Sequence, residues 1–282
     1  MEDKIQYISL DELKPFPGHP FHIRDDDAMQ DTVDSIKEYG VLVPAIVRPC
    51  EDGGYEIVSG HRRKYASELA GLKTMPVIVR ELDRDAATVV MVDSNLQREN
   101  ILPSERAAAY KMKLEALKRQ GERNDLTSAQ VVPKLTAREK VAEDAGVNRM
   151  EVTRYVRLTE LQPELQKMVD EKKIAITPAV EISYLKPDEQ KLLLDTIESE
   201  QATPSLSQAQ RMKKLSQSGE LNDDTMLGIM MEQKKTERMD ITIPAEVLQK
   251  YFPRSYTPQK MQETIIKLLE SWQKKRQQNL QR

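Results

Sequence analysis

Apolar residues in the first hundred positions follow two alternating patterns, one typical of strands and one of helices. Alternating or continuous apolar runs predict strands over 5–10, 45–48, 55–58 and 75–79. Helical periodicity predicts helices over 28–39, 62–70 and 85–93, and the sequence Asp52-Gly53-Gly54 is typical of a hairpin turn. The pattern therefore predicts a compact domain of mixed α+β class over residues 1–101.

From Pro103 onward the strand pattern disappears and helical periodicity dominates. Ser104 can cap a helix. Its predicted apolar face comprises Ala107, Tyr110, Leu114 and Leu117, and its other faces carry Lys111, Lys113, Lys118 and Arg119. The polar segment 121–136 is expected to be a loop, and helices resume at Arg138. We therefore expect an all-helical domain over residues 102–200.

The last eighty residues divide into a polar segment and a second periodic one. Residues 201–236 are rich in Ser, Thr, Pro and Gln, and we expect a partly helical linker there. Residues 240–243 alternate like a strand, and Thr257-Pro258 can start a helix. A narrow apolar seam on that helix, suited to a partner helix, comprises Met261, Ile265, Leu268 and Trp272. The pattern predicts a small strand–helix dimerisation unit over 237–282; the alternative is that it packs on the middle domain of the same chain.

Composition excludes several classes of protein. Charged residues make up 32% of the 282 residues and aromatic residues only 5%, which disfavours one large β-sandwich. The single cysteine, Cys50, cannot form an intramolecular disulfide, and three histidines are too few for a structural zinc site of Cys and His. No apolar run approaches the roughly 20 residues that span a bilayer. We therefore expect a soluble, cytoplasmic protein without a membrane partner.

The charge distribution separates the first domain from the rest. The net charge of the chain is −3, but residues 1–100 carry −7 and residues 101–180 carry +3. A basic middle domain can meet DNA phosphates while the acidic domain stays clear of them. Solvated surface charge is the alternative explanation.

Residues 138–158 carry the spacing of a helix-turn-helix. Ala142 allows a second helix to cross closely, Gly146 fits a left-handed corner, and Val152 anchors the second helix. The face away from these anchors carries Asn148, Arg149, Thr153, Arg154 and Arg157. Arginine can contact guanine edges or phosphates, and Asn and Thr can contact bases or phosphates, so we predict that these residues bind DNA. A solvated face of an ordinary helical bundle is the alternative.

Two polar segments of the first domain can bind an anion. Gly60-His61-Arg62-Arg63 stands between a strand and a helix, where backbone N–H groups and guanidinium groups favour a phosphate. Thirty residues later, the run 94–100 includes Ser94, Asn95 and Arg98, whose side chains can contact a base edge or a metal-bound phosphate. Salt bridges between Arg62, Arg63 and the surplus acids of this domain are the alternative.

The order of these motifs resembles the ParB family of partition proteins over about residues 5–200. The segments that carry the resemblance are 40–44, 46–48, 55–63, 95–99, 103–107 and the helix-turn-helix. The resemblance implies an N-terminal nucleotide-binding domain that uses CTP with Mg²⁺, a central domain that binds a parS-like site on double-stranded DNA, and a C-terminal domain that forms a homodimer. It also implies a DNA clamp closed by CTP, a ParA-type ATPase as partner, and association with the nucleoid or a plasmid.

The chain departs from the family pattern in both anion-binding segments. His61 stands where the family has glutamate in Gly-Glu-Arg-Arg-aromatic-Arg, and the last two residue types of that motif are exchanged in Lys64-Tyr65. Ser94 stands where the family has glutamate before Asn-Leu-Gln-Arg. The resemblance leaves nucleotide binding by Gly60, His61, Arg62, Arg63, Ser94, Asn95 and Arg98 in place, with Asn95 at the metal. The lost glutamate at Ser94 makes CTP hydrolysis weak or absent, although Asp93 can substitute in part. These departures suggest a divergent plasmid or mobile-element branch.

Two other functions remain open from the sequence. A ParB-like transcription regulator would share the DNA-binding motifs without a role in partition. A nucleotide-dependent kinase or nuclease can be built on the same N-terminal fold, although the helix-turn-helix and the dimerisation seam argue against an enzyme.

Overall fold

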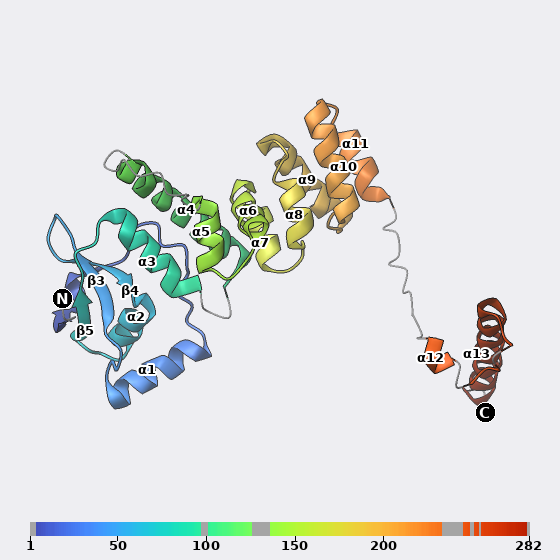
Figure 1. Cartoon of the computed structure of the whole chain (residues 1–282), viewed down its shortest axis with the longest axis horizontal. Helices are drawn as coiled ribbons and strands as arrows, with labels where there is room; N and C mark the ends of the chain where they lie inside the picture. Colours follow the sequence, from blue (N-terminus) through green and yellow to red (C-terminus); the bar gives the residue numbers. More distant parts are fainter. Residues whose placement is uncertain are drawn as a thin grey trace. The chain divides into compact units, whose positions relative to one another are not determined.

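The computed structural model describes residues 4–96, 101–125, 136–232, 245–248, 251–253 and 255–280. They fall into two units, Met1–Glu232 and Gln233–Arg282, and each is described by itself (Figure 1). The first unit contains a sheet followed by helices, and the α+β class predicted from the sequence is confirmed.

Five strands form one mixed sheet in the order β1-β5-β3-β4-β2. Their bounds are β1 Ile5–Ser9, β2 Leu13–Lys14, β3 Ala45–Pro49, β4 Tyr55–Ser59 and β5 Thr74–Val79. The β3–β4 hairpin is antiparallel, as predicted, and β5 pairs antiparallel with β1 and parallel with β3. Only β2 was not predicted, because two residues are too short to show a periodicity.

Helices and apolar side chains cover both faces of the sheet. Ile57 belongs to the apolar core on one face, and the next residue, Val58, belongs to the core on the other face, where α3 (Arg84–Leu96) packs. Helix α1 (Asp27–Tyr39) packs on α2 (His61–Leu69) through the predicted face Met29, Val33 and Ile36. The start of α2 thus directly follows β4, and α3 packs on the face of the sheet that carries Val58.

The rest of the first unit is helical. Its elements are α4 Pro103–Asp125, α5 Ala137–Asp144, α6 Arg149–Arg157, η2 Leu158–Glu160, α7 Pro163–Asp170, α8 Ile176–Ile182, α9 Pro187–Glu200, α10 Leu206–Ser218 and α11 Asp223–Met231. The predicted apolar face of α4 is buried. The loop expected from residue 121 is wrong for 121–125, where α4 continues because Glu and Arg are good helix formers.

The linker expected over 201–236 is also wrong in large part. Helices α10 and α11 belong to the core of the helical domain, where Met212 and Met226 are fully buried together with Ile182 and Leu193. Ser205 starts α10 with a capping box. Because these helices are rich in Ser and Gln, their two short apolar faces were not recognised in the sequence. The helical domain extends through residue 231.

The second unit contains α12 (Ala245–Leu248) and α13 (Pro258–Leu280). The predicted start of α13 is confirmed, since the backbone N–H of Lys260 donates to Thr257 Oγ1 at 3.4 Å. The strand predicted over 240–243 lies outside the described residues. Within the described ranges, no helix is both long and apolar enough to cross a membrane.

Candidate functional site

The corner between α5 and α6 has the geometry of a helix-turn-helix. Val141 and Val152 are fully buried, and Gly146 has a φ of 65°, in the left-handed region that glycine tolerates. The backbone N–H of Val147 donates to Ala142 O at 2.9 Å. Asn148 caps α6 by accepting from the N–H of Glu151 at 2.8 Å. The predicted motif is confirmed, and Asn148 has a capping role in addition to its predicted DNA contact.

Three of the predicted DNA-binding side chains lie together on the outer part of α6. Arg149 is exposed and pairs with Glu139 at 3.5 Å, and Thr153 donates to Arg149 O at 3.0 Å. Arg154 is exposed and makes no hydrogen bond or ion pair with any residue that the structure describes. Met150, which the sequence analysis did not single out, is 64% exposed on the same helix. Its side chain can contact a thymine methyl group.

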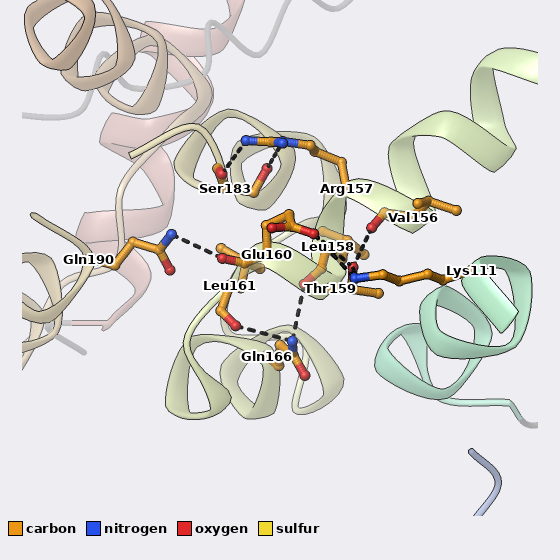
Figure 2. Close-up of polar contacts among 10 residues, drawn as sticks. All are labelled: Lys111, Val156, Arg157, Leu158, Thr159, Glu160, Leu161, Gln166, Ser183 and Gln190. Carbon is orange, nitrogen blue, oxygen red and sulfur yellow. Dashed lines mark hydrogen bonds and ion pairs between the residues drawn. The ribbon is translucent and has the colours of Figure 1, made fainter. Parts of the chain in front are cut away.

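Arg157 does not share this exposed face. Its Nε donates to Ser183 Oγ at 3.1 Å and its Nη2 donates to Ser183 O at 2.7 Å, so the guanidinium group is directed at α8 (Figure 2). The structure therefore separates Arg157 from the other four predicted DNA-binding residues.

The two anion-binding segments of the first domain meet in one pocket of about 110 Å³. Its lining comprises His19, Phe21, His22, Ile23, Ser59, Gly60, His61, Arg62, Arg63, Ser94 and Asn95. Both segments were predicted to bind one nucleotide, and this role requires Gly60–Arg63 to lie next to Ser94 and Asn95, as it does. Arg98 lies outside the described residues. The segment 19–23 was missed, although it holds two of the three histidines of the chain.

The start of α2 has a backbone geometry and a helix dipole that favour an anion. Gly60 precedes the helix with a φ of 120°, and a Cβ atom there would lie 2.7 Å from Ala45 Cβ, so only glycine fits. Gly60 has no side chain that could cap this helix start. The dipole at the start of a helix favours a negative ligand.

The two arginines of this segment differ in how they are held. Arg63 Nη1 donates to Val43 O at 2.7 Å and to Pro44 O at 2.6 Å, which anchors the loop before β3. Among the residues that the structure describes, Arg62 has one partner, Asp26, in a long ion pair at 3.9 Å. Since that contact is weak, the Arg62 guanidinium group can turn to a phosphate at little cost.

His61 joins the start of α2 to the loop 16–23. Its Nε2 accepts from the backbone N–H of Phe16 at 3.2 Å, and its ring centroid lies 4.0 Å from that of His19. His19 Nδ1 is 2.8 Å from Phe21 O, so it donates there. Because a carboxylate cannot stack in this way, the histidine in place of glutamate changes the contact between the pocket and this loop.

Asn95 and Ser94 offer neutral oxygen atoms to the pocket. Asn95 Nδ2 donates to Met91 O at 2.8 Å, which leaves the amide oxygen to accept a hydrogen bond or to ligate a hard cation. The described lining of this pocket contains no carboxylate. A Mg²⁺ ion fits here only with most of its charge balanced by the phosphates of a ligand.

A second pocket of about 310 Å³ adjoins the first through Phe21, His22 and Arg62. Its remaining lining comprises Arg24, Asp26, Ala28, Ile101 and Glu105. Glu105 Oε1 accepts from the backbone N–H of His22 at 2.9 Å and lies 3.0 Å from His22 Nδ1. The start of α4 is thereby attached to the loop that both pockets share.

Lys113 connects the pocket to the helix-turn-helix. The sequence placed it on an exposed face, but its side chain is fully buried. Its Nζ pairs with Asp93 of α3 and, at 2.6 Å, with Asp144 of α5. Burial is possible because two carboxylates compensate the charge. Asp93, considered above as a substitute for the missing glutamate, is occupied by this ion pair.

The predicted dimerisation seam lies on α13. Met261 and Ile265 are half-buried within the second unit, whereas Leu268 is 62% exposed. The adjacent Leu269 and Ile266 are also exposed, at 57% and 48%. Trp272 lies on the same helix. An apolar surface of this kind is typical of a helix that has a partner.

Comparison with protein families agrees with both sites. Residues 1–96 match the model of the ParB N-terminal domain, and residues 124–220 match the model of the ParB HTH domain. The chain belongs to the ParB family. The first match includes Gly60–Arg63 and Asn95, and the second includes the helix-turn-helix and α10, which supports the extension of the helical domain beyond residue 200.

Curated members of the ParB family are similar over the same part of the chain. Stage 0 sporulation protein J of Bacillus subtilis is 35% identical over 170 residues, 60% of this chain and 54% of that protein. A chromosome-partitioning protein ParB assigned as probable in Coxiella burnetii is 30% identical over 168 residues, 60% and 52% of the two chains. The match thus spans about half the length of these relatives.

Two solved structures of a C-terminally truncated ParB from Caulobacter crescentus are also similar. One is complexed to the centromeric parS site, with 26% identity, a TM-score of 0.46, and coverage of 74% of this chain and 98% of that one. The other is complexed with CTP-gamma-S, with 30% identity, a TM-score of 0.32, and coverage of 67% and 96%.

Proposed function

We propose that this ParB-family chain is a DNA-binding partition protein that recognises a parS-like centromere site and acts as a CTP-dependent clamp on DNA. The observation that carries the proposal is the pocket in which Gly60–Arg63 meets Ser94 and Asn95, on a chain that also carries a helix-turn-helix. The segregated molecule is a plasmid or a chromosome, with a ParA-type ATPase as the partner.

The pocket geometry supports a specific placement of the nucleotide. The triphosphate would lie at the start of α2, where the helix dipole favours it and Arg62 would donate to it. Asn95 Oδ1 and the Ser94 hydroxyl would hold a Mg²⁺ ion, which would neutralise part of the phosphate charge. The adjoining pocket of about 310 Å³ has room for the nucleoside.

The DNA interface that we propose is the outer face of α6. Arg149, Thr153 and Arg154 contact bases or phosphates of the major groove, and Asn148 holds the start of the helix against the backbone. In the free protein Arg149 pairs with Glu139 at 3.5 Å, so DNA competes with Glu139 for this guanidinium group.

A homodimer completes the proposal, since a clamp around DNA needs two chains. We propose that α13 pairs with its counterpart through Met261, Ile265, Leu268 and Trp272. Sedimentation of the full chain is expected to give a dimer, and Leu268→Asp is expected to give a monomer. Gln262→Asp, an exposed position on the same helix, is the matched control. A wild-type monomer at tens of micromolar would refute this part.

Calorimetry tests the nucleotide part of the proposal. The full chain is titrated with CTP, ATP, GTP and UTP in the presence of Mg²⁺. We expect binding of CTP in preference to the other three. No binding of any nucleotide would refute the pocket assignment, and preference for ATP with phosphate transfer would favour an enzyme on the same fold.

A further inference from the structure

The guanidinium group of Arg157 at the end of α6 is held within the protein. Nε and Nη2 both donate to Ser183, whose exposure is only 2% (Figure 2). The guanidinium carbon lies 4.1 Å from the ring centroid of Tyr184. A planar group held by two hydrogen bonds and a stacked ring has lost the freedom that a surface arginine uses to reach a phosphate.

Helix α10 also contacts the ring of Tyr184. Lys213 Nζ lies 3.7 Å from the ring centroid of Tyr184, and it also pairs with Glu181 at 2.8 Å. Tyr184 is therefore contacted by one cation from α6 and one from α10. The end of α6 is attached at this point to α8 and α10 together.

The segment that follows α6 is fixed by further polar contacts. Gln166 Nε2 donates to Leu158 O and Leu161 O, and Gln190 Nε2 donates to Glu160 O (Figure 2). Lys111 of α4 donates to Thr159 Oγ1 at 3.2 Å. Two members of this network lie on α6: Arg157, and Val156, whose carbonyl oxygen accepts from Thr159 Oγ1 at 2.9 Å.

From this geometry we infer that Arg157 is a positioning residue that sets the direction of α6 toward DNA, and not a residue that contacts DNA. The inference rests on the proposed DNA-binding function of α6. If the fork onto Ser183 is lost, α6 can tilt about its buried anchor Val152, and the base contacts made from the outer face of α6 lose their register. Contacts with phosphates depend less on orientation, so they persist.

The experiment measures DNA affinity as a function of salt concentration for the full chain and its variants. The specific probe is a duplex that the wild-type chain selects from a random library, and the nonspecific probe is the same duplex with a scrambled sequence. The variants are Arg157→Ala, Arg157→Lys, Ser183→Ala and, as the matched control on the same helix, Arg154→Ala. Thermal melting of each variant checks that it is folded.

We expect Arg157→Ala to weaken binding of the selected duplex about tenfold, the size of a partly lost base contact. Affinity for the scrambled duplex and the slope of log affinity against log salt should stay unchanged. Arg157→Lys should resemble Arg157→Ala, because lysine keeps the charge but not the fork. Ser183→Ala should shift affinity in the same direction by a smaller factor and keep the salt slope. Arg154→Ala, by contrast, should reduce the salt slope by about 0.9 if it contacts one phosphate.

Two results would overturn the inference. One is a lower salt slope in Arg157→Ala together with full rescue by Arg157→Lys, which is the behaviour of a phosphate contact. The other is an equal loss of affinity for both duplexes, in proportion to the loss of folded protein, which is the behaviour of a residue needed only for stability. If Arg157→Ala does not fold, the smaller change Ser183→Ala provides the test. If the wild-type chain selects no sequence, the proposed DNA-binding function fails, and the inference fails with it.

Discussion

The ammonium group of Lys113 lies 2.6 Å from a carboxylate oxygen of Asp144, and the lysine side chain is entirely buried. Its second partner, Asp93, directly precedes Ser94, which lines the proposed nucleotide pocket. Asp144 lies just before the corner of the helix-turn-helix. One buried cation on α4 thus joins the last turn of α3 to the end of α5.

We expect removal of both carboxylates to cost more than the sum of the single changes. Asp93→Asn or Asp144→Asn should each lower the free energy of unfolding by about 1 kcal/mol, because the remaining carboxylate still compensates the lysine. The double variant leaves a buried cation without a counter-charge, which should cost about 3 to 5 kcal/mol. Urea unfolding measures all three values, and strict additivity would contradict this account. Asp34→Asn, in an exposed pair with Lys37, is the control and should change little.

Arg62 and Arg63 are expected to respond differently to truncation. Arg62→Ala should weaken CTP binding by about tenfold, the value of one charge-assisted contact, and leave the melting temperature unchanged. Arg63→Ala should weaken CTP binding and also lower the melting temperature, because it releases the carbonyl groups of Val43 and Pro44. Lys64→Ala, next on the same helix but outside the pocket lining, is the control. Equal melting temperatures for both arginine variants would show that the Arg63 contacts have no structural role.

Hydrolysis of CTP should be slow in the wild-type chain. Ser94 is a neutral ligand, and Asp93 is held by Lys113, so no described carboxylate lines the pocket beside Asn95. Ser94→Glu should raise phosphate release by an order of magnitude or more in the presence of DNA, because a carboxylate holds Mg²⁺ and its water more firmly. Ser94→Gln is the control without charge. Brisk release of phosphate by the wild-type chain would mean that another acid takes this role.

Acid should weaken the start of the helix-turn-helix. Hydrogen bonds from the backbone N–H and the hydroxyl of Thr136 lower the pKa of Glu139, with a smaller contribution from Arg149. A carboxyl group whose pKa is lower in the folded state stabilises fully above its unfolded value, and this stabilisation is lost as the pH falls through the folded value. The pH dependence of unfolding below about pH 4.5 should therefore be shallower in Glu139→Gln, which keeps a cap but not the charge. An identical pH profile would contradict the role of this carboxylate.

Local signals predicted much of the fold. The apolar periodicity of α1 and α4, the β3–β4 hairpin and the helix-turn-helix depend on residues close in sequence, and each lies where it was predicted. Gly60–Arg63 and Ser94–Asn95 were expected to act together, and they line one pocket. Gly60–Arg63 was identified by its residue types at a helix start, which is a local property. Ser94 and Asn95 lie in the last turn of α3, and the family resemblance linked them to that segment.

Features that depend on tertiary contacts were not predicted. Lys113 has the sequence of an exposed lysine, and only its two distant carboxylates make its burial possible. The loop 19–23 reaches the pocket because His61 holds Phe16 and His19, and nothing near that loop in sequence indicates the contact. Arg157 is spaced like a DNA-contacting residue, yet α8 lies where its side chain points. The apolar residues of α10 and α11 form short faces, and these become recognisable as core only through their packing against α8 and α9.

The most direct test of a partition function is to sequence the DNA that crosslinks to the full chain in its host. We predict a few clustered sites that share one sequence, with enrichment that spreads into the flanking DNA. In Arg62→Ala the enrichment should be limited to the sites themselves. Sites scattered over promoters, without spreading, would contradict it and would identify the protein as a transcription regulator.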